Sequence, residues 1–242
     1  MQKLSLIGIG TGDPGHVTRA GVTAMRSVEC LLIPEKGEGK DDLAQLRRSL
    51  MAELAPDVPV VPFSMPVRDT ELPYHDGVEV WHDAIAEAWV AALPRPVSHV
   101  GLLVWGDPSL YDSTLRIAAR LSPMPAIEVV PGITALQALT AAFTVTLNDV
   151  NAPVLITTGR QLRDHGWPAD AARVAVMLDG ECSFQKLDPA GVTIWWGAYL
   201  GLPNQLLRQG PLADVAADII ALRAEARASH GWIMDTYLLE RA

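Results

Sequence analysis

Short apolar runs alternate along the first half of the chain with longer segments in which apolar and polar positions recur at helical spacing. The apolar runs predict strands at 3–8, 29–34, 58–62, 99–105 and 127–130. The longer segments predict helices at 17–28, 41–54, 76–93, 113–121 and 134–143. Strands that are apolar on both faces are typical of parallel sheets covered by helices on both sides. The alternation therefore predicts an α/β domain.

A cluster of Asn, Asp and Pro at 147–153 predicts a domain boundary, which places an N-terminal α/β domain at 1–148 and a second, smaller α/β domain at 151–242. In the second domain, apolar runs predict strands at 154–158, 174–178, 192–197 and 232–239. Helices are expected at 203–208 and 213–228, and the segment 180–191 is expected to be a connecting loop.

Composition narrows the class of protein. The formal net charge of the 242 residues is -9, which disfavours a nucleic-acid surface because phosphate binding needs basic patches. The two cysteines, Cys30 and Cys182, are too few for a disulfide framework or a zinc cluster, so we expect no metal. No apolar run is long enough to span a membrane and no signal peptide is indicated, so a cytoplasmic protein is expected.

The turn after the first strand spells G-x-G-x-x-G with Gly10, Gly12 and Gly15, the pattern of a dinucleotide-binding loop. Two residues inside the match oppose that reading. Pro14 lacks an N–H that could hold a pyrophosphate, and Asp13 places a carboxylate where phosphate oxygens would lie. The same residues suit the start of a helix, with Asp13 as the cap and Pro14 in the first turn. An NAD loop, an ordinary turn and a loop for another ligand all stay open.

Two further turns have a similar design. Gly106 and Asp107 follow the strand at 99–105, and Pro131-Gly132 follows the strand at 127–130. In open α/β sheets, ligands bind beyond the carboxyl ends of the strands, where all three turns should gather. Because Asp13 and Asp107 bring negative charge there, a positively charged ligand fits the turns better than one with phosphates.

Taken in order, "GIGTGDPGHVT", "WGDPSLY" and "VPGITALQAL" resemble the motifs of the tetrapyrrole methylases. "VAVMLDG" and "IWWGAYLGLPNQ" are similar to the second-domain motifs of that family, which commonly has Tyr-Met-Gly where this chain has "MLDG". The resemblance implies two α/β domains with a cleft between them that holds S-adenosylmethionine, unlike a standard Rossmann methyltransferase.

The resemblance also implies which residues bind. The cofactor is expected to contact Gly106, Asp107, Pro108, Leu110, Tyr111, Thr134, Ala135, Met177, Leu178, Gly197 and Ala198. The tetrapyrrole substrate is expected beside Gly10, Thr11, Gly12, Pro14 and His16. Because the substrate carries carboxylates, Arg19, Arg116, Arg160 and Arg163 are candidates to bind them.

Within the family, "LPYHDGVEVWHDAI" and "TIWWGAYLG" are closer to the deacetylating corrin methylases than to the uroporphyrinogen methylases. This implies methylation of precorrin-5 at C-1 with loss of an acetyl group as acetic acid; methylation of another tetrapyrrole is the alternative, and an NAD-dependent oxidoreductase is a more distant one. Acetyl loss needs proton transfer, for which Asp13, Tyr111 and Asp112 are candidates, with His16, His75 and His82 as further possibilities. Family members are commonly homodimers, and Trp89 is the residue expected to face a partner subunit.

Overall fold

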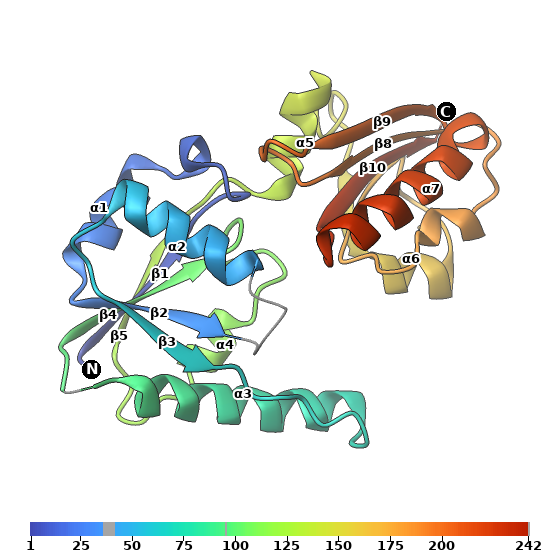
Figure 1. Ribbon diagram of the computed structural model, residues 1–242. Coiled ribbons are helices and arrows are strands. Elements are labelled where there is room, and N and C mark those ends of the chain that lie inside the picture. Colours follow the sequence, from blue (N-terminus) through green and yellow to red (C-terminus); the bar gives the residue numbers. More distant parts are fainter. Residues whose placement is uncertain (36–41, 95, 242) are drawn as a thin grey trace. The chain divides into compact units, whose positions relative to one another are not determined.

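A computed structural model describes residues 1–35, 42–94 and 96–241. Its contacts divide the chain into two compact units, Met1–Thr134 and Ala135–Ala242, called unit 1 and unit 2 below (Figure 1). Each unit consists of one five-stranded sheet with helices packed on it. The α/β class expected from the sequence is confirmed for both units.

The sheet of unit 1 is entirely parallel, as its apolar strands predicted. Its strand order is β3-β2-β4-β1-β5. The strands are β1 (Lys3–Gly8), β2 (Cys30–Glu35), β3 (Val60–Ser64), β4 (His99–Val104) and β5 (Ala126–Val130). Because all five run in one direction, the turns that follow them leave from the same edge.

Helices cover both faces of this sheet (Figure 1). One core layer joins the sheet to α1 (Arg19–Ser27) and α2 (Asp42–Leu54). The other joins it to α3 (Tyr74–Ala92) and α4 (Thr114–Ala118). Trp89 of α3 is only 3% exposed and packs edge-on against Phe63, so the prediction that it faces a partner subunit is wrong.

The sheet of unit 2 is mixed, in the order β6-β7-β10-β8-β9. Its strands are β6 (Val154–Thr158), β7 (Arg173–Met177), β8 (Val192–Ala198), β9 (Leu206–Pro211) and β10 (Asp235–Arg241). Only β6 and β7 pair in parallel; the other neighbours are antiparallel. The helices are α5 (Ala135–Phe143), α6 (Gly159–His165) and α7 (Leu212–His230), with a 3-10 turn at Ser183–Lys186.

The structure corrects two expectations for unit 2. The helix expected at 203–208 is wrong, because Leu206–Pro211 forms β9 and pairs in register with β8 from Ala198 to Thr193. Its polar residues Arg208 and Gln209 follow two leucines, which imitates helical spacing, and the exposed edge position of the strand tolerates them. Helix α6, which begins directly after β6, was not expected at all.

The contacts also place α5 in unit 2, whereas the sequence placed the domain boundary after it. Leu139 of α5 lies against Gly197 of β8, and α5 contacts β10 as well. The Asn- and Asp-rich segment at 147–153 therefore connects α5 to β6 within the same unit.

Among the helices in the described part of the chain, none has the length and apolar character needed to cross a membrane. The described residues also contain no group of three or more His, Cys, Asp or Glu side chains placed to hold a metal ion.

Candidate functional site

The three glycine-containing turns of unit 1 are joined to one another at the carboxyl edge of its sheet. Gly10 and Gly106 form an isolated antiparallel bridge, in which Gly106 N donates to Gly10 O at 2.7 Å and Gly10 N donates to Gly106 O at 3.3 Å. The third turn is tied in by Gly132 N, which donates to Asp107 Oδ2 at 2.9 Å. The turns predicted to gather at one edge do so, and we call this group the turn cluster.

Backbone packing inside the turn cluster leaves no room for side chains at two glycines. A Cβ on Gly132 would lie 2.1 Å from Gly106 O and 2.8 Å from Gly8 C. A Cβ on Gly8 would lie 2.6 Å from Gly132 N. These neighbours are backbone atoms, which cannot rotate away. Glycine is thus required at Gly8 and Gly132 for the three turns to meet.

Asp107 is the side chain that fastens the turn cluster. Its Oδ1 accepts hydrogen bonds from Ser109 N at 2.8 Å and Ser109 Oγ at 2.5 Å, while Oδ2 accepts from Gly132 N. Partial burial raises the pKa of Asp107, but the hydrogen bonds from Ser109 and Gly132 outweigh it and hold that pKa below its usual value. Asp107 is therefore ionised at neutral pH. Its carboxylate caps the turn that follows it and places a negative charge at the turn cluster.

The first loop is a helix start, as its Asp-Pro pair predicted. Asp13 caps the 3-10 turn Pro14–His16 by accepting from Gly15 N at 2.7 Å, with Pro14 in the first turn. The longer helix α1 begins only at Arg19 and has its own cap, Thr18. A dinucleotide loop would lead directly into that helix, so this geometry disfavours the NAD interpretation.

Thr11 and His16 close the first loop, because Thr11 Oγ1 and His16 Nδ1 lie 2.8 Å apart. Gly12 is buried, and Gly10 has a φ of 68°, a conformation that suits glycine. Gly10, Thr11, Gly12, Pro14 and His16 thus form one small folded loop beside Gly106.

The second loop continues from Asp107 to the start of α4. Leu110 N donates to Asp107 O at 3.2 Å, and Pro108 is buried. Tyr111 is 42% exposed and has a φ of 49°, and partial burial raises the pKa of its hydroxyl. Asp112 Oδ1 accepts from Thr114 N at 2.6 Å. Asp107, Tyr111 and Asp112 therefore lie on one continuous loop at the carboxyl edge.

The candidate arginines differ in what they contact. Arg116 donates to Asp112 O at 2.7 Å, which places it beside the second loop. Arg19 and Arg160 are exposed, on α1 and α6. Arg163 is ion-paired with Asp164 and Glu181 at 2.9 Å each within unit 2. A direct hydrogen bond therefore ties Arg116 to the second loop.

The candidate histidines on α3 separate as well. His75 is exposed near the start of the helix. His82 is 1% exposed, and neither of its ring nitrogens has a hydrogen-bond partner among the described residues. Burial is the main cause that lowers the pKa of His82, so the ring is held neutral in the core of unit 1.

In unit 2, the candidate residues Met177 and Leu178 lie where β7 ends. Leu178 is 66% exposed and has a φ of 53°, a conformation that costs energy for a residue with a side chain. Hydrogen bonds to the residue that follows, Asp179, hold this turn in place.

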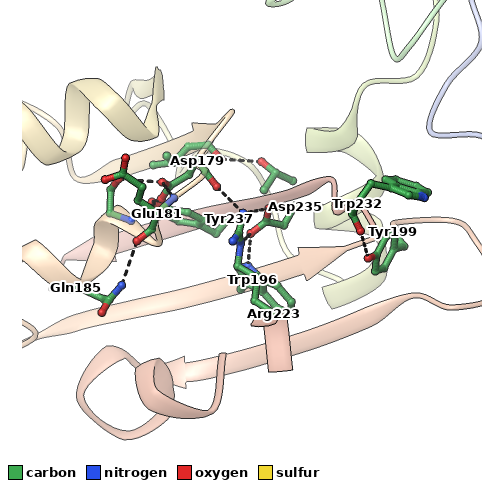
Figure 2. A network of polar contacts seen from close by, with 12 residues as sticks. Asp179, Glu181, Gln185, Trp196, Tyr199, Arg223, Trp232, Asp235 and Tyr237 are labelled. Carbon is green, nitrogen blue, oxygen red and sulfur yellow. Dashed lines mark hydrogen bonds and ion pairs between the residues drawn. The ribbon is translucent and has the colours of Figure 1, made fainter. Parts of the chain in front are cut away.

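Asp179 anchors this turn through a buried network (Figure 2). Its Oδ2 accepts from Tyr237 Oη at 2.6 Å and from Ser183 N at 2.6 Å. Its Oδ1 accepts from Ser183 Oγ at 2.9 Å and Glu181 N at 3.0 Å. Hydrogen bonds to the whole carboxylate therefore hold the turn after β7 against β10.

A buried ion pair extends this network into α7 (Figure 2). Arg223 donates to Asp179 O at 3.0 Å and pairs with Asp235 at 2.9 Å. Trp196 Nε1 also donates to Asp235, at 3.0 Å. Burial raises the pKa of Asp235, and Arg223 and Trp196 act against that rise. We call Asp179, Arg223, Asp235 and Tyr237 the buried network.

Gly197 and Ala198, the remaining unit 2 candidates, lie at the end of β8 and are buried. A Cβ on Gly197 would lie 2.7 Å from Leu200 Cδ2 and 2.9 Å from Leu139 Cδ1, so a side chain here would have to displace the ends of these two leucines. Tyr199 follows with a φ of 51° and donates its hydroxyl to Trp232 O at 2.5 Å. Asp179 was not expected from the sequence as a functional group, although an aspartate directly after an apolar strand was a usable signal.

Residues 3–216 match the family described as Tetrapyrrole (Corrin/Porphyrin) Methylases, and the chain belongs to this family. A curated relative from Sinorhizobium sp, precorrin-6A synthase [deacetylating], is 43% identical over all of this chain and 96% of its own length. Among solved structures, a cobalamin synthesis related protein (CobF) from Corynebacterium diphtheriae has a TM-score of 0.84 and 35% identity, covering 100% of this chain and 99% of its own.

A more distant structure shares the fold. Uroporphyrin-III C-methyl transferase from Thermus thermophilus, complexed with S-adenyl homocysteine, has a TM-score of 0.61 at 18% identity, with 98% of this chain and 97% of that chain covered. The family and fold expected from the sequence are thereby confirmed.

The residues of this chain suit S-adenosylmethionine, the cofactor of the family. The ionised Asp107 carboxylate favours a sulfonium cation electrostatically. Gly106 and Gly132 in these turns are partly exposed, and a residue without a side chain lets a ligand approach the backbone closely.

Proposed function

We propose that the chain is an S-adenosylmethionine-dependent C-methyltransferase of cobalamin biosynthesis that converts precorrin-5 into precorrin-6A. The methyl group goes to C-1 of the macrocycle. Water adds to the carbonyl carbon of the acetyl group, the bond between that carbon and the macrocycle breaks with its electron pair going to the ring, and acetic acid leaves. The observation that supports this most strongly is the 43% identity to precorrin-6A synthase over the full chain.

The reaction needs orientation more than it needs a strong base. The bound cofactor supplies a methyl group activated by a sulfonium, and an electron-rich ring carbon attacks it in line. Holding two reactants in line lowers a barrier by on the order of 7–11 kcal/mol. The stiff turn cluster, in which backbone meets backbone at Gly8, Gly106 and Gly132, is suited to that task.

The proposal assigns cofactor contacts to the turns that surround Asp107 and to the strand ends of unit 2. The Asp107 carboxylate favours the sulfonium, and neighbouring backbone groups bind the polar parts of the cofactor. The full assigned set is Gly106, Asp107, Pro108, Leu110, Tyr111, Thr134, Ala135, Met177, Leu178, Gly197 and Ala198.

Acetyl loss requires water to attack a carbonyl carbon while a nearby group moves its proton. We assign this role to Asp13, Tyr111 and Asp112. Each aspartate uses Oδ1 to cap a turn, and its Oδ2 makes no hydrogen bond with any described residue. Substrate contacts are assigned to the first loop, Gly10 to His16, and to Arg19 and Arg116.

Mass spectrometry of the products formed from precorrin-5 and S-adenosylmethionine tests the proposal. The expected product has gained one methyl group and lost the acetyl group, with acetic acid released. No methyl transfer to precorrin-5, together with transfer to another precursor in a panel of tetrapyrroles, would show that the substrate is a different one.

Single-turnover measurements on Asp13→Asn and Asp112→Asn test the proton-transfer role. A variant that methylates at the wild-type rate but retains the acetyl group identifies the group responsible. If both variants release acetic acid as fast as the wild type, the two aspartates are not involved.

The proposal includes a cytoplasmic homodimer, on the basis of the family resemblance. Light scattering on the purified protein tests the stoichiometry: a mass near twice 26.1 kDa is expected, and a mass of one chain contradicts it.

A further inference from the structure

Arg47 of helix α2 is not among the residues assigned to the proposed reaction. The guanidinium of Arg47 lies over the indole ring of Trp105, 5.0 Å from the ring centre. Trp105 directly follows β4 and precedes Gly106, so this stacked pair adjoins the turn cluster. We call Arg47 and Trp105 the stacked pair.

Arg47 contacts the sheet at the point where strands β2 and β4 stop pairing. Strands β2 and β4 pair only as far as Leu32 and Leu102, whereas β2 continues to pair with β3 up to Glu35. On β4, Val104 O accepts from Ile9 N on the β1 side, so Leu103 O points toward β2. Strand β2 no longer supplies a backbone donor to this carbonyl, and Arg47 Nε donates to it instead, at 3.4 Å.

The neighbouring strands β2 and β4 also lead to helices on opposite faces of the sheet. Helix α2 packs on one face and α4 on the other. In doubly wound sheets this switch in direction marks the place where ligands bind beyond the strand ends. Arg47 thus lies where the topology of unit 1 favours a ligand.

The charge of Arg47 is poorly compensated by the described residues. With the described residues it makes two hydrogen bonds, to Leu103 O and Leu43 O, both 3.4 Å long. No carboxylate of these residues lies within ion-pairing distance of it. Burial lowers the pKa of Arg47 to about 10, and Asp112 opposes that change. At neutral pH the group is a cation with N–H donors to spare.

The stacking orients the guanidinium. Trp105 Nε1 is enclosed without a hydrogen-bond partner among the described residues, so packing rather than a hydrogen bond places the ring. The guanidinium lies over the indole ring, and its planar fork of N–H donors matches the two oxygens of a carboxylate.

We propose that the stacked pair is a carboxylate-binding site, in which Arg47 receives a carboxylate of the ligand. The inference rests on the proposed function, which supplies two sources of that group: the acid side chains of the tetrapyrrole and the amino-acid end of the cofactor. Arg47 then determines how the ligand is oriented above the turn cluster.

The test compares Arg47→Gln with Arg26→Gln. Both remove one positive charge, and Arg26 also donates Nε to a backbone carbonyl, that of Leu54 at 2.8 Å, but it lies in the last turn of α1, at the opposite end of that helix from the carboxyl edge. Binding of a polycarboxylate porphyrin is followed by quenching of tryptophan fluorescence, and binding of S-adenosylhomocysteine by calorimetry.

Arg47→Gln is expected to weaken one of the two ligands by roughly 10- to 100-fold, while Arg26→Gln stays within about twofold. Weaker porphyrin binding identifies the substrate as the source of the carboxylate, and weaker S-adenosylhomocysteine binding identifies the cofactor. Arg47→Lys, which keeps the charge without the fork, is expected to recover only part of the affinity.

Unchanged affinity for both ligands in a folded Arg47→Gln protein would overturn the inference. Because both measurements are equilibrium binding, they do not depend on turnover. Failure of the enzyme to methylate precorrin-5 would count against the proposed function and leave the result for Arg47 intact.

Discussion

The turn cluster of unit 1 and the buried network of unit 2 hold candidate ligand loops in opposite ways. In the turn cluster, backbone packs on backbone at Gly8, Gly106 and Gly132, with Asp107 as the fastening side chain. In unit 2, buried side chains around Asp179 fasten the turn that exposes Leu178.

The two constructions should fail under different substitutions. Backbone contact is broken by adding atoms, because no side chain can move aside. A buried polar network is broken by removing atoms, because the groups left behind lose their partners. Unit 1 should therefore be sensitive to glycine replacement, and unit 2 to truncation of its charged residues.

The largest effect is expected in the buried network. Arg223→Met leaves Asp235 buried without its charge partner and removes the hydrogen bond to Asp179 O. Breaking a buried pair costs about 3–5 kcal/mol in the free energy of unfolding, measured by urea denaturation. Arg227→Met on the same helix, at an exposed position, should change it by less than about 0.5 kcal/mol. Equal stability of the two variants would mean that the ion pair contributes nothing.

Gly132→Ala should have the next largest effect. The new methyl group would lie 2.1 Å from Gly106 O, and relieving this contact separates two of the turns. We expect a loss of about 3 kcal/mol in the free energy of unfolding, at the upper end for added core atoms. Gly180→Ala is the matched control in unit 2, since apart from its chain neighbours no heavy atom of the described residues lies within 4 Å of the added Cβ. A Gly132→Ala protein as stable as Gly180→Ala would contradict the backbone packing.

Asp107→Ala tests whether the carboxylate in the turn cluster contributes to cofactor binding. Loss of the carboxylate removes the hydrogen bonds from Ser109 and Gly132 together with the negative charge. Calorimetry should show S-adenosylmethionine binding weakened roughly tenfold, about 1.4 kcal/mol. Ser109→Ala, which keeps the charge, should bind nearly as well as the wild type. Unchanged affinity in a folded Asp107→Ala protein would leave Asp107 with a structural role only.

The smallest effect is expected in how stability depends on pH, through His82 in the core of unit 1. Burial, aided by Arg120 and Arg116, lowers the pKa of His82 in the folded state, while Glu79 and Asp83 act in the other direction. The unfolded chain therefore takes up this proton first, at its ordinary pKa of 6.5. Stability contributed by neutral His82 is present above that pH and is lost as the pH falls below it.

Melting temperatures of the wild type and His82→Leu between pH 8 and pH 5 check this prediction (roughly one to two units on either side of the ordinary histidine pKa). The fall in melting temperature on acidification should be smaller in His82→Leu. An identical pH dependence would show that the pKa of His82 is the same in the folded and the unfolded protein, which contradicts the prediction.

Local chemistry in the sequence predicted much of unit 1. The parallel sheet followed from continuous apolar runs, which only burial on both faces explains. The cap at Asp13 and the helix start at Pro14 followed from short-range preferences, since a carboxylate and a fixed φ act within three residues. The ordered motifs were enough to recognise the family.

What the sequence could not determine depends on partners far along the chain. Strand β9 was mistaken for a helix because its edge position comes from pairing with β8. Asp179 gained its role from Tyr237, 58 residues away, and Arg47 from Leu103 O, 56 residues away. The closeness of Gly132 to Gly106 likewise exists only once β5 and β4 lie on either side of β1.

The sequence by itself therefore determined the class of the fold, the caps and the family, because periodicity and short-range hydrogen bonding act between near neighbours. Only the tertiary structure decided how closely the turns pack on one another, which charges are buried and which arginine lies beside the turn cluster. Those properties arise from contacts between distant segments, and no local pattern encodes them.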